Sequence, residues 1–343
     1  MNKAIVDSKD VNEAFDCRIL ELRFVENLAD ISKPSFKKVW VMIVIFFKLL
    51  SSLIRWRPQL VYFTLAPLGA AFYRDAIYIA LIKCFGVRIA YHLHGVGIKE
   101  GAEKSAIKRR VAKFIFRNSS VISLAKVLQA DIEAVYEGPV PFIQPNSIPN
   151  YNFPEKMPSG KPVFLFLSNL IKDKGIYTFL DALKMLHSRN VDFKALIVGA
   201  PFNVTIEDVR QKIQEYNLTG KVEVPGPLYG NDKLQIISNA DVLVSPTKND
   251  TYPLVILEAM QAGKAVIASN IGAISEMIDD GETGFVIPSC EDAAGFAEKM
   301  EVLANNVSLS RAMGEKGRQK FLNRYTMKTY EANEVSILNQ ILN

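Results

Sequence analysis

The sequence of 343 residues is poor in the side chains that form disulfides or hold metals. Its three cysteines, Cys17, Cys84 and Cys290, lie far apart and form no CxxC pair, which excludes a disulfide-stabilised secreted scaffold. We therefore expect buried, reduced thiols in a cytosolic protein. The sequence also has no D-x-D motif, so we expect chemistry that uses no divalent metal ion.

The sequence also lacks an uninterrupted apolar run of about 18 to 20 residues, the length that spans a bilayer. Residues 39–54 form the most apolar segment, and Lys48 interrupts it. One interpretation is a buried helix of a doubly wound domain. The other is a helix that lies against a membrane, because basic residues that would bind anionic lipid flank it: Lys33, Lys37, Lys38, Arg55 and Arg57. The N-terminal residues MNKAIVDSKD lack the apolar core of a signal peptide.

The charge balance is mildly basic, with 41 lysines and arginines against 36 acidic residues and a net charge of +5. The basic residues are not interleaved with aromatic residues in the way that favours nucleic acid, so we expect no nucleic-acid partner. Residues 103–117 are predicted to form a strongly basic helix. Such a helix presents either an ordinary solvated face or a contact for anionic lipid or a lipid-diphosphate acceptor.

Short apolar runs alternate with helical patterns along the chain, which is typical of parallel sheets whose ligands bind at the carboxyl ends of the strands. Prolines between residues 139 and 158 place a domain boundary near residue 152. We expect a first domain at 1–152, a second at 153–325 and a final helix at 326–343. The elements predicted in the first domain are the tail of an amphipathic helix at 1–12, a helix at 72–85, and strands at 17–25, 60–65, 87–93 and 121–124.

One strand, loop and helix in the second half combine several chemical signals. A short apolar strand precedes the segment 249–263, NDTYPLVILEAMQAG. We expect Asp250 or Thr251 to cap the helix, Pro253 to lie in its first turn and Gly263 to end it. Because the first amides of a helix are unpaired and carry positive dipole density, this helix start suits an anion such as a diphosphate.

Two acidic residues, Asp250 and Glu258, bracket this helix start. A carboxylate in contact with a phosphate would repel it, whereas carboxylates hydrogen-bond well to hydroxyls such as those of a ribose and a sugar. The pattern therefore indicates a cradle for a nucleotide sugar. The alternative, from the pattern alone, is an ordinary capped helix with a solvated acid.

The order of an acid, seven residues, then Glu, Ala-Met and a glycine resembles the signature of glycosyltransferase family 4. The resemblance continues through Gly272, Glu276 and the stretch DDGETGF to about Pro288, and with weaker matches upstream it covers most of the chain. It implies an α/β protein of the GT-B fold, with two Rossmann-like, doubly wound parallel-sheet domains that face a cleft. It also implies that the C-terminal helix crosses back to the first domain. Family members usually carry Glu at the position of Asp250.

The resemblance assigns a nucleotide-sugar donor, a UDP-sugar or GDP-sugar, and no cofactor. Glu258 would hold the ribose of this donor and Asp250 the hydroxyls of its sugar. The turns at Gly199 and Gly226 would line the nucleotide pocket, although as pure pattern they are ordinary turns after strands.

Lys174 precedes a helix predicted at 176–189 and resembles the phosphate-binding lysine of the family. With the amides of Leu254 and Val255, it would neutralise a leaving diphosphate without a metal. Most relatives carry Arg five positions earlier, where this chain has Asn169, which can donate a hydrogen bond but supplies no charge. Without the resemblance, Lys174 is a surface lysine beside a turn.

Two histidines end the strand predicted at 87–93, and His92 and His94 lie on the same side if the strand continues through both. An H-x-H pair can bind metal, but no third ligand follows at a suitable spacing. The plain alternative is a structural histidine at a strand end. The resemblance favours His94 as the family's active-site histidine, whose neutral imidazole would hydrogen-bond a sugar hydroxyl, while Gly95 would let the backbone approach the ligand.

Family members normally begin with a strand, a Gly-rich loop and a helix. That first strand and its glycines are absent here, so we expect a first domain truncated at its start. The function that the resemblance implies is a retaining, metal-independent hexosyltransferase of bacterial surface polysaccharide synthesis. It would be cytoplasmic, at the inner face of the membrane, with a glycan or lipid-linked acceptor and a peripheral contact with anionic membrane. The alternatives are a nucleotide-sugar epimerase of the same fold and a catalytically impaired, donor-binding remnant.

Overall fold

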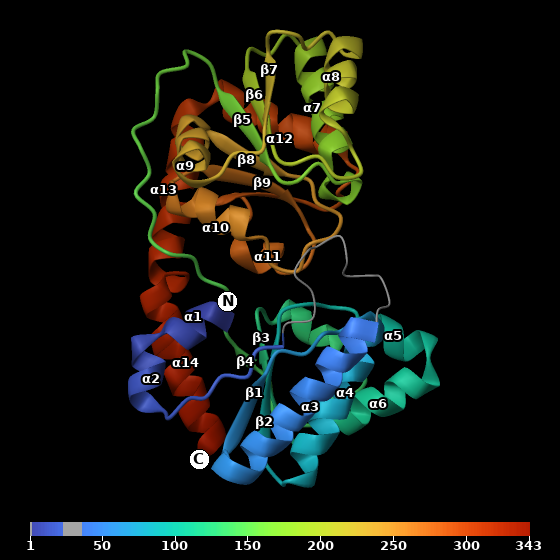
Figure 1. Cartoon of the computed structure of the whole chain (residues 1–343). Helices are drawn as coiled ribbons and strands as arrows, with labels where there is room; N and C mark the ends of the chain where they lie inside the picture. The colour runs from blue at the N-terminus through green and yellow to red at the C-terminus, as the bar shows by residue number, and fades with distance from the viewer. Residues whose placement is uncertain (1, 23–35) are drawn as a thin grey trace. The chain divides into compact units, whose positions relative to one another are not determined.

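The computed structural model describes residues 2–22 and 36–343 (Figure 1). The chain divides into two compact units, one comprising Met1–Gln144 with Glu331–Asn343 and the other Pro145–Tyr330. Each unit contains one parallel sheet. The prolines predict a boundary near residue 152, but the division lies earlier, after Gln144. The reason is that residues just after Gln144 already pair within the second unit. For example, the Pro149 carbonyl accepts a hydrogen bond from Gln261.

The sheet of the first unit has four parallel strands in the order β1-β2-β3-β4 (Figure 1). These strands are β1 (Leu60–Phe63), β2 (Arg88–Leu93), β3 (Ser120–Ser123) and β4 (Phe142–Ile143). The helices are α1 (Asn2–Asp7), α2 (Lys9–Ala14), α3 (Phe36–Trp56), α4 (Gly69–Cys84), α5 (Ile98–Lys104), α6 (Ala106–Phe116), a 3-10 helix at Val127–Asp131, and α14 (Met327–Leu342) from Glu331 onward. The strands predicted at 60–65, 87–93 and 121–124 and the helix predicted at 72–85 are confirmed.

The two faces of this sheet pack against different helices. Tyr91 of β2 belongs to one core cluster with Ile79 of α4 and Ile115 of α6. Its neighbour Ala90 points the other way and packs with Ile337 of α14. Because side chains alternate along a strand, the same rule sends His92 to the α14 face of the sheet.

Helix α3 is fixed to the unit along one side only. Its residues Ile45 and Leu53 are buried in the core cluster, and the Tyr78 hydroxyl donates a hydrogen bond to the Met42 carbonyl. The stretch Lys38–Trp56 is long and apolar enough to cross a membrane, with a mean hydropathy of 1.8, yet only 11% of its most apolar window is buried. The interpretation of this segment as a buried core helix is therefore wrong for most of its surface.

Two further predictions for the first unit are wrong. Cys17 and Cys84 are exposed, and Cys290 of the second unit is partly exposed, so the thiols are not buried. Residues 17–22 have no regular secondary structure, and the rest of the strand predicted at 17–25 lies outside the described residues.

The basic helix predicted at 103–117 is two helices. Ser105 ends α5, and its hydroxyl accepts a hydrogen bond of 3.2 Å from the Lys108 amide, which starts α6 as a new helix. The Lys108 side chain does not join a solvated basic face. Its Nζ donates to the carbonyls of Pro67 and Gly97, at 2.9 and 3.3 Å.

The sheet of the second unit has six parallel strands in the order β10-β9-β8-β5-β6-β7. These strands are β5 (Val163–Leu167), β6 (Lys194–Val198), β7 (Val222–Gly226), β8 (Val242–Ser245), β9 (Ala265–Ser269) and β10 (Gly284–Ile287). The helices are α7 (Ile176–Ser188), α8 (Ile206–Glu215), α9 (Gly230–Asn239), α10 (Leu254–Gln261), α11 (Ile274–Met277), α12 (Ala293–Asn305), α13 (Val307–Arg324), and the first residues of α14, with a 3-10 helix at Lys172–Lys174.

Counted from β5, the strand order is that of a dinucleotide-binding Rossmann sheet, in which the direction of winding reverses between two central strands. Here the reversal lies between β5 and β8, which are hydrogen-bonded neighbours. Both faces are covered, because Phe164 and Phe166 join the main core cluster while the alternating Leu165 is also buried. Open sheets of this kind bind ligands beyond the carboxyl ends of the strands at the reversal.

Candidate functional site

The loops that follow β5 and β8 are held together by their backbones. The Lys248 amide donates a hydrogen bond of 2.8 Å to the Asp173 carbonyl. Gly175, with φ +80°, forms the N-cap of α7 and lies so close to the second loop that an added Cβ would stand 1.9 Å from the Pro246 oxygen. The glycine is therefore required both for its left-handed backbone and for this approach.

This approach places Lys174 against the loop after β8. Its Nζ lies 2.5 Å from Oδ2 of Asp250 and 3.0 Å from the Asn249 carbonyl. Both side chains of the ion pair remain about a quarter exposed, 25% for Lys174 and 24% for Asp250. The predicted phosphate-binding lysine and the predicted sugar-binding acid thus meet at the strand-order reversal, within reach of a ligand.

Helix α10 begins without a side-chain cap. Its N-cap residue is Pro253, and no side chain accepts a hydrogen bond from its first turn. The prediction that Asp250 or Thr251 caps the helix is therefore wrong, because Asp250 pairs with Lys174 instead. The uncapped amides at Leu254 and Val255 are suited to an anion, since helix N-terminal amides need an acceptor.

Glu258 is buried on α10 and pairs with a lysine that the sequence analysis did not single out. Nζ of Lys233, on α9, lies 2.6 Å from Oε1 of Glu258, and the side chain of Glu258 is 10% exposed. The partnership joins residues 25 positions apart on different helices. Its only signal in the sequence is a lysine four positions before the apolar Ile237, on the same side of α9, which does not identify its partner.

The predicted glycine turns lie side by side at the carboxyl ends of β5, β6 and β7. The Gly199 amide donates to the Gly226 carbonyl at 3.2 Å. A Cβ on Gly199 would stand 1.8 Å from the Ser168 oxygen and 3.0 Å from Cα of Asn169. Gly226 has φ +88°, which favours glycine. The backbone of Asn169 is thus close to that of Gly199.

His92 and His94 lie on the same face of the first unit's sheet, as predicted, with ring centroids 4.1 Å apart. Burial lowers the pKa of the His94 imidazole to about 4, so the ring is neutral near pH 7. Its Nε2 is buried and has no hydrogen-bond partner among the described residues. A neutral ring with an unsatisfied nitrogen is suited to a ligand hydroxyl.

The surroundings of His94 include a partly buried tyrosine–histidine hydrogen bond and a buried carboxyl group. The Tyr62 hydroxyl hydrogen-bonds with Nδ1 of His92. Glu334 of α14 is fully buried, and burial raises the pKa of its carboxyl to about 7, with a smaller opposing effect of the Tyr62 hydroxyl. Glu334 is therefore a proton-binding group next to the residues that support His94.

Glu334 makes the stability of the first unit depend on pH. Because its folded pKa of about 7 exceeds the ordinary value of 4.5, folding takes up a proton, so the free energy of unfolding falls as pH rises through about 7. The full effect is on the order of 3 kcal/mol. We expect Glu334→Gln to flatten this slope in urea unfolding between about pH 5 and 8. Glu331→Gln, on the same helix and partly exposed, is the matched control and should keep the wild-type slope.

The structure groups the predicted site residues by unit. Lys174 and Asp250 are in direct contact, and Glu258 and the amides of Leu254 and Val255 lie on the helix that follows Asp250. His94 belongs to the first unit, so its place beside the same ligand stays a prediction. Among residues 2–22 and 36–343, no group of three or more His, Cys, Asp and Glu side chains is arranged to hold a metal ion.

Comparisons with known sequences match the second unit. Residues 147–320, just over half of the chain, match the family described as "Glycosyl transferases group 1". The capsular polysaccharide biosynthesis glycosyltransferase CapM of Staphylococcus aureus is 27% identical over 161 residues, covering 47% of this chain and 41% of that protein. Alpha-maltose-1-phosphate synthase of Mycobacterium tuberculosis H37Rv is 27% identical over 174 residues, covering 49% of this chain and 45% of that protein. The matched part thus spans less than half the length of these relatives.

Solved structures match nearly the whole chain. Sucrose-phosphate synthase from Thermosynechococcus elongatus has a TM-score of 0.72 and 20% identity, covering 90% of this chain and 80% of that one. Anabaena HepE, in complex with UDP and glucose, has a TM-score of 0.68 and 19% identity, covering 90% of this chain and 84% of that one. At such identities the likeness shows the fold, which is GT-B, as the sequence resemblance implied. The chain belongs to the glycosyl transferases of group 1.

Proposed function

We propose that this glycosyltransferase moves a hexose from a nucleoside-diphosphate sugar to a glycan or lipid-linked acceptor, with retention of configuration. The proposed setting is bacterial surface polysaccharide synthesis at the cytoplasmic face of the membrane, by analogy with relatives such as CapM of Staphylococcus aureus. No metal ion is needed in this proposal. Anabaena HepE is described with UDP and glucose, which makes UDP-sugars the first donors to test.

The observation that carries the proposal is the place of the Lys174–Asp250 pair. It lies where the strand order reverses, beside the uncapped start of α10. The lysine supplies a positive charge, and the lysine and the free amides supply hydrogen-bond donors for a diphosphate. The carboxylates of Asp250 and Glu258 supply acceptors for hydroxyls. A nucleotide sugar combines a diphosphate with two sets of hydroxyls, on its ribose and on its sugar, and so matches this set of donors and acceptors.

The proposed chemistry is the one that the resemblance to glycosyltransferase family 4 implies. The bond between the sugar's anomeric carbon and the diphosphate oxygen breaks as the acceptor hydroxyl forms its bond to the same carbon from the same face. The departing phosphate oxygen takes the acceptor's proton. Lys174 and the α10 amides stabilise the negative charge that develops on the diphosphate, which is the main electrostatic task in such a transfer. The neutral imidazole of His94 would hydrogen-bond a sugar hydroxyl.

The donor can be identified by thermal unfolding with a panel of nucleotides and nucleotide sugars. A nucleotide that binds the folded protein raises its Tm by mass action. The stabilising donor is then incubated with acceptor candidates, and the product's anomeric configuration is read by NMR. Retention in a transferred sugar supports the proposal. An epimerised nucleotide sugar formed without an acceptor would instead identify an epimerase, and tight donor binding without any product would identify a donor-binding remnant.

Lys233 gives a more specific test of the donor site. We expect Lys233→Ala to raise KM for the donor about tenfold with little change in kcat, because Glu258 loses the partner that orients it toward the ribose. Steady-state kinetics with the identified donor measures this. Lys212→Ala removes another Lys–Glu pair of the same unit, an exposed pair on α8, and should leave KM unchanged. An unchanged KM in both variants would show that the Lys233–Glu258 pair does not serve the donor.

A further inference from the structure

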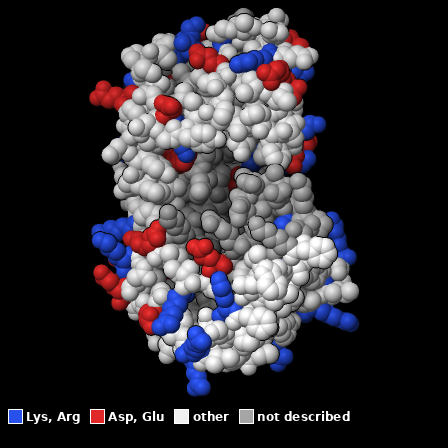
Figure 2. Space-filling view, in the orientation of Figure 1, with Lys and Arg blue, Asp and Glu red and all other residues white. Residues whose placement is uncertain are grey.

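The outward face of α3 is apolar along its length. Phe36, Trp40, Phe47 and Ile54 follow one another at helical spacing and are 96%, 66%, 61% and 56% exposed. From Phe36 to Ile54 this stripe extends about 27 Å. Figure 2 shows the corresponding broad white surface over α3 at the lower right, with blue side chains at its rim. Exposed apolar surface of this extent marks an interaction site.

A helix with this composition can either cross a bilayer or lie on one. In α3 the side opposite the stripe is already occupied, because Ile45 and Leu53 are buried in the core cluster and Met42 accepts the hydrogen bond from Tyr78. Crossing a bilayer would require breaking these contacts. The helix is therefore built to lie in the plane of a surface, with one face in the protein and the other in the partner.

The neighbouring helix also exposes apolar side chains. Helix α4 packs against both α3 and α6. Its residues Tyr73 and Ile77 are exposed one turn apart on the same side of the helix. We call these three helices, α3, α4 and α6, the outer layer of the first unit. Phe114 of α6 is exposed as well, with the Lys83 ammonium over its ring.

The outer layer is positively charged and nearly free of acids. Its only acidic residue is Asp75, which is 1% exposed and forms an ion pair of 2.6 Å with Arg74. Lys48 and Arg55 lie along one edge of the apolar stripe of α3, and no ion pair involves either among the described residues. The exposed or partly exposed basic residues of the outer layer are Lys38, Lys48, Arg55, Arg74, Lys83, Arg109, Arg110 and Lys113. An apolar face with basic flanks complements anionic lipid rather than another protein core.

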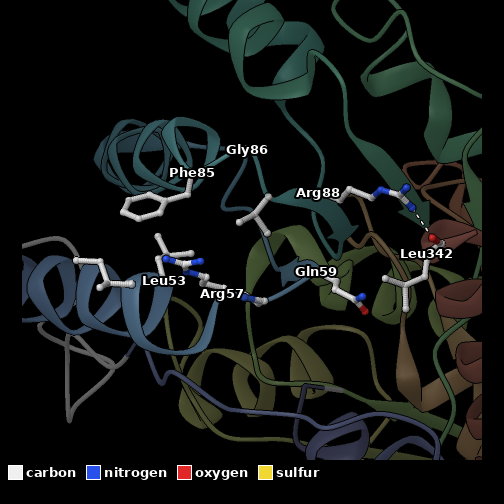
Figure 3. A pocket seen from close by; sticks show the side chains of 10 residues that line it. Leu53, Arg57, Gln59, Phe85, Gly86, Arg88 and Leu342 are labelled. Atoms are coloured by element: carbon white, nitrogen blue, oxygen red, sulfur yellow. Dashed lines mark hydrogen bonds between the residues drawn. The ribbon is translucent and has the colours of Figure 1, made fainter.

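A cavity of about 690 Å³ adjoins the C-terminal end of α3. It is lined on one side by Leu53, Phe85 and Arg57, and on the other by Arg88, whose guanidinium donates to the Leu342 carbonyl (Figure 3). The Arg57 side chain forms no ion pair within the described part of the chain, so its charge is available at this edge. Apolar walls beside a cation suit the phosphate and first methylenes of a lipid.

We propose that the outer layer docks the protein on an anionic membrane surface, with α3 in the plane of the headgroups and its stripe among the upper acyl chains. The purpose of such docking rests on the proposed function, because docking would bring the transferase to a lipid-linked acceptor. Lipid binding itself needs no sugar transfer, so the two are separable by experiment.

The two tryptophans of the chain, Trp40 and Trp56, both lie on α3 and make the test direct. In the variant Trp56→Phe, the fluorescence comes from Trp40 alone. We expect vesicles containing phosphatidylglycerol to shift this emission to the blue and to expose Trp40 to quenching by brominated lipid. Vesicles of phosphatidylcholine alone should do so weakly, and added salt should weaken the effect of phosphatidylglycerol because it screens the basic flanks.

Two variants divide the apolar from the electrostatic contribution. In vesicle co-sedimentation, we expect Phe47→Glu to weaken binding at least about tenfold, because it places a charge in the stripe. Lys48→Glu with Arg55→Glu should weaken it to a similar degree through the lost attraction to anionic lipid. Phe202→Glu is the matched control, since Phe202 is 76% exposed in the second unit. All three variants should keep donor binding, which separates failure of docking from failure of the proposed function.

Three results would overturn the docking. The first is an emission of Trp40 that does not respond to anionic vesicles. The second is a loss of vesicle binding in Phe202→Glu as large as the loss in Phe47→Glu. The third is a failure of acrylamide to quench Trp40 before any vesicle is added. In that last case the stripe is already covered in solution, and sedimentation velocity of wild type and Phe47→Glu would show whether a second copy of the chain covers it.

Discussion

Replacing Lys174 with alanine is expected to lower kcat/KM for sugar transfer by about 10²- to 10³-fold. The ammonium group of Lys174 joins the loop after β5 to the loop after β8, and Asn169 supplies no charge in its neighbourhood. Without it, Asp250 would face the diphosphate as an unpaired carboxylate. Steady-state kinetics with the identified donor measures the loss, most of which should appear in kcat.

The fold should survive this substitution. Both members of the Lys174–Asp250 pair are about a quarter exposed, and ion pairs of that kind contribute about 1 kcal/mol or less to stability. Lys172→Ala removes an exposed lysine from the same short 3-10 helix and is the matched control, expected to leave kcat/KM unchanged. An active Lys174→Ala enzyme would remove this lysine from the proposed mechanism, whereas equal losses in both variants would indicate a disturbed loop.

The strands of the sheet were predictable because burial on both faces leaves a local trace. Residues 163–167, VFLFL, are apolar throughout and form β5, which lies between β8 and β6 in the sheet. The closeness of Lys174 to Asp250 could also be anticipated, because both residues follow strands of one parallel sheet. Carboxyl ends of such strands meet at one edge whatever the details of the loops.

Features that depend on contacts distant in sequence could not be predicted. The partnership of Lys233 with Glu258 joins two helices, and neither helix records the other in its own residues. Lys108 was assigned to a solvated or lipid-binding face, but it is buried because Gly97 and Pro67 offer their carbonyls to it. The exposure of the apolar stripe of α3 could not be predicted either, because an apolar helix has the same composition whether it faces a core or a membrane.

Replacing Gly175 with alanine is expected to destabilise the second unit by about 3 kcal/mol. An L-residue at φ +80° costs about 1 to 2 kcal/mol, and displacing the Pro246 carbonyl, 1.9 Å from the new Cβ, adds about 1 to 3 kcal/mol. Because this displacement separates the loop of Lys174 from that of Asp250, donor affinity should fall as well. Urea unfolding gives the stability, and thermal stabilisation by the donor gives the affinity.

Gly220 offers a control with the same backbone conformation. It also has φ +80°, but a Cβ there would meet nothing within 4 Å. Gly220→Ala should therefore cost only the conformational part, about 1 to 2 kcal/mol, and leave donor binding unchanged. The difference between the two variants isolates the contact between Gly175 and Pro246. If both alanines cost the same and both proteins bind donor equally well, the close approach of the two loops is not what holds Lys174 beside Asp250.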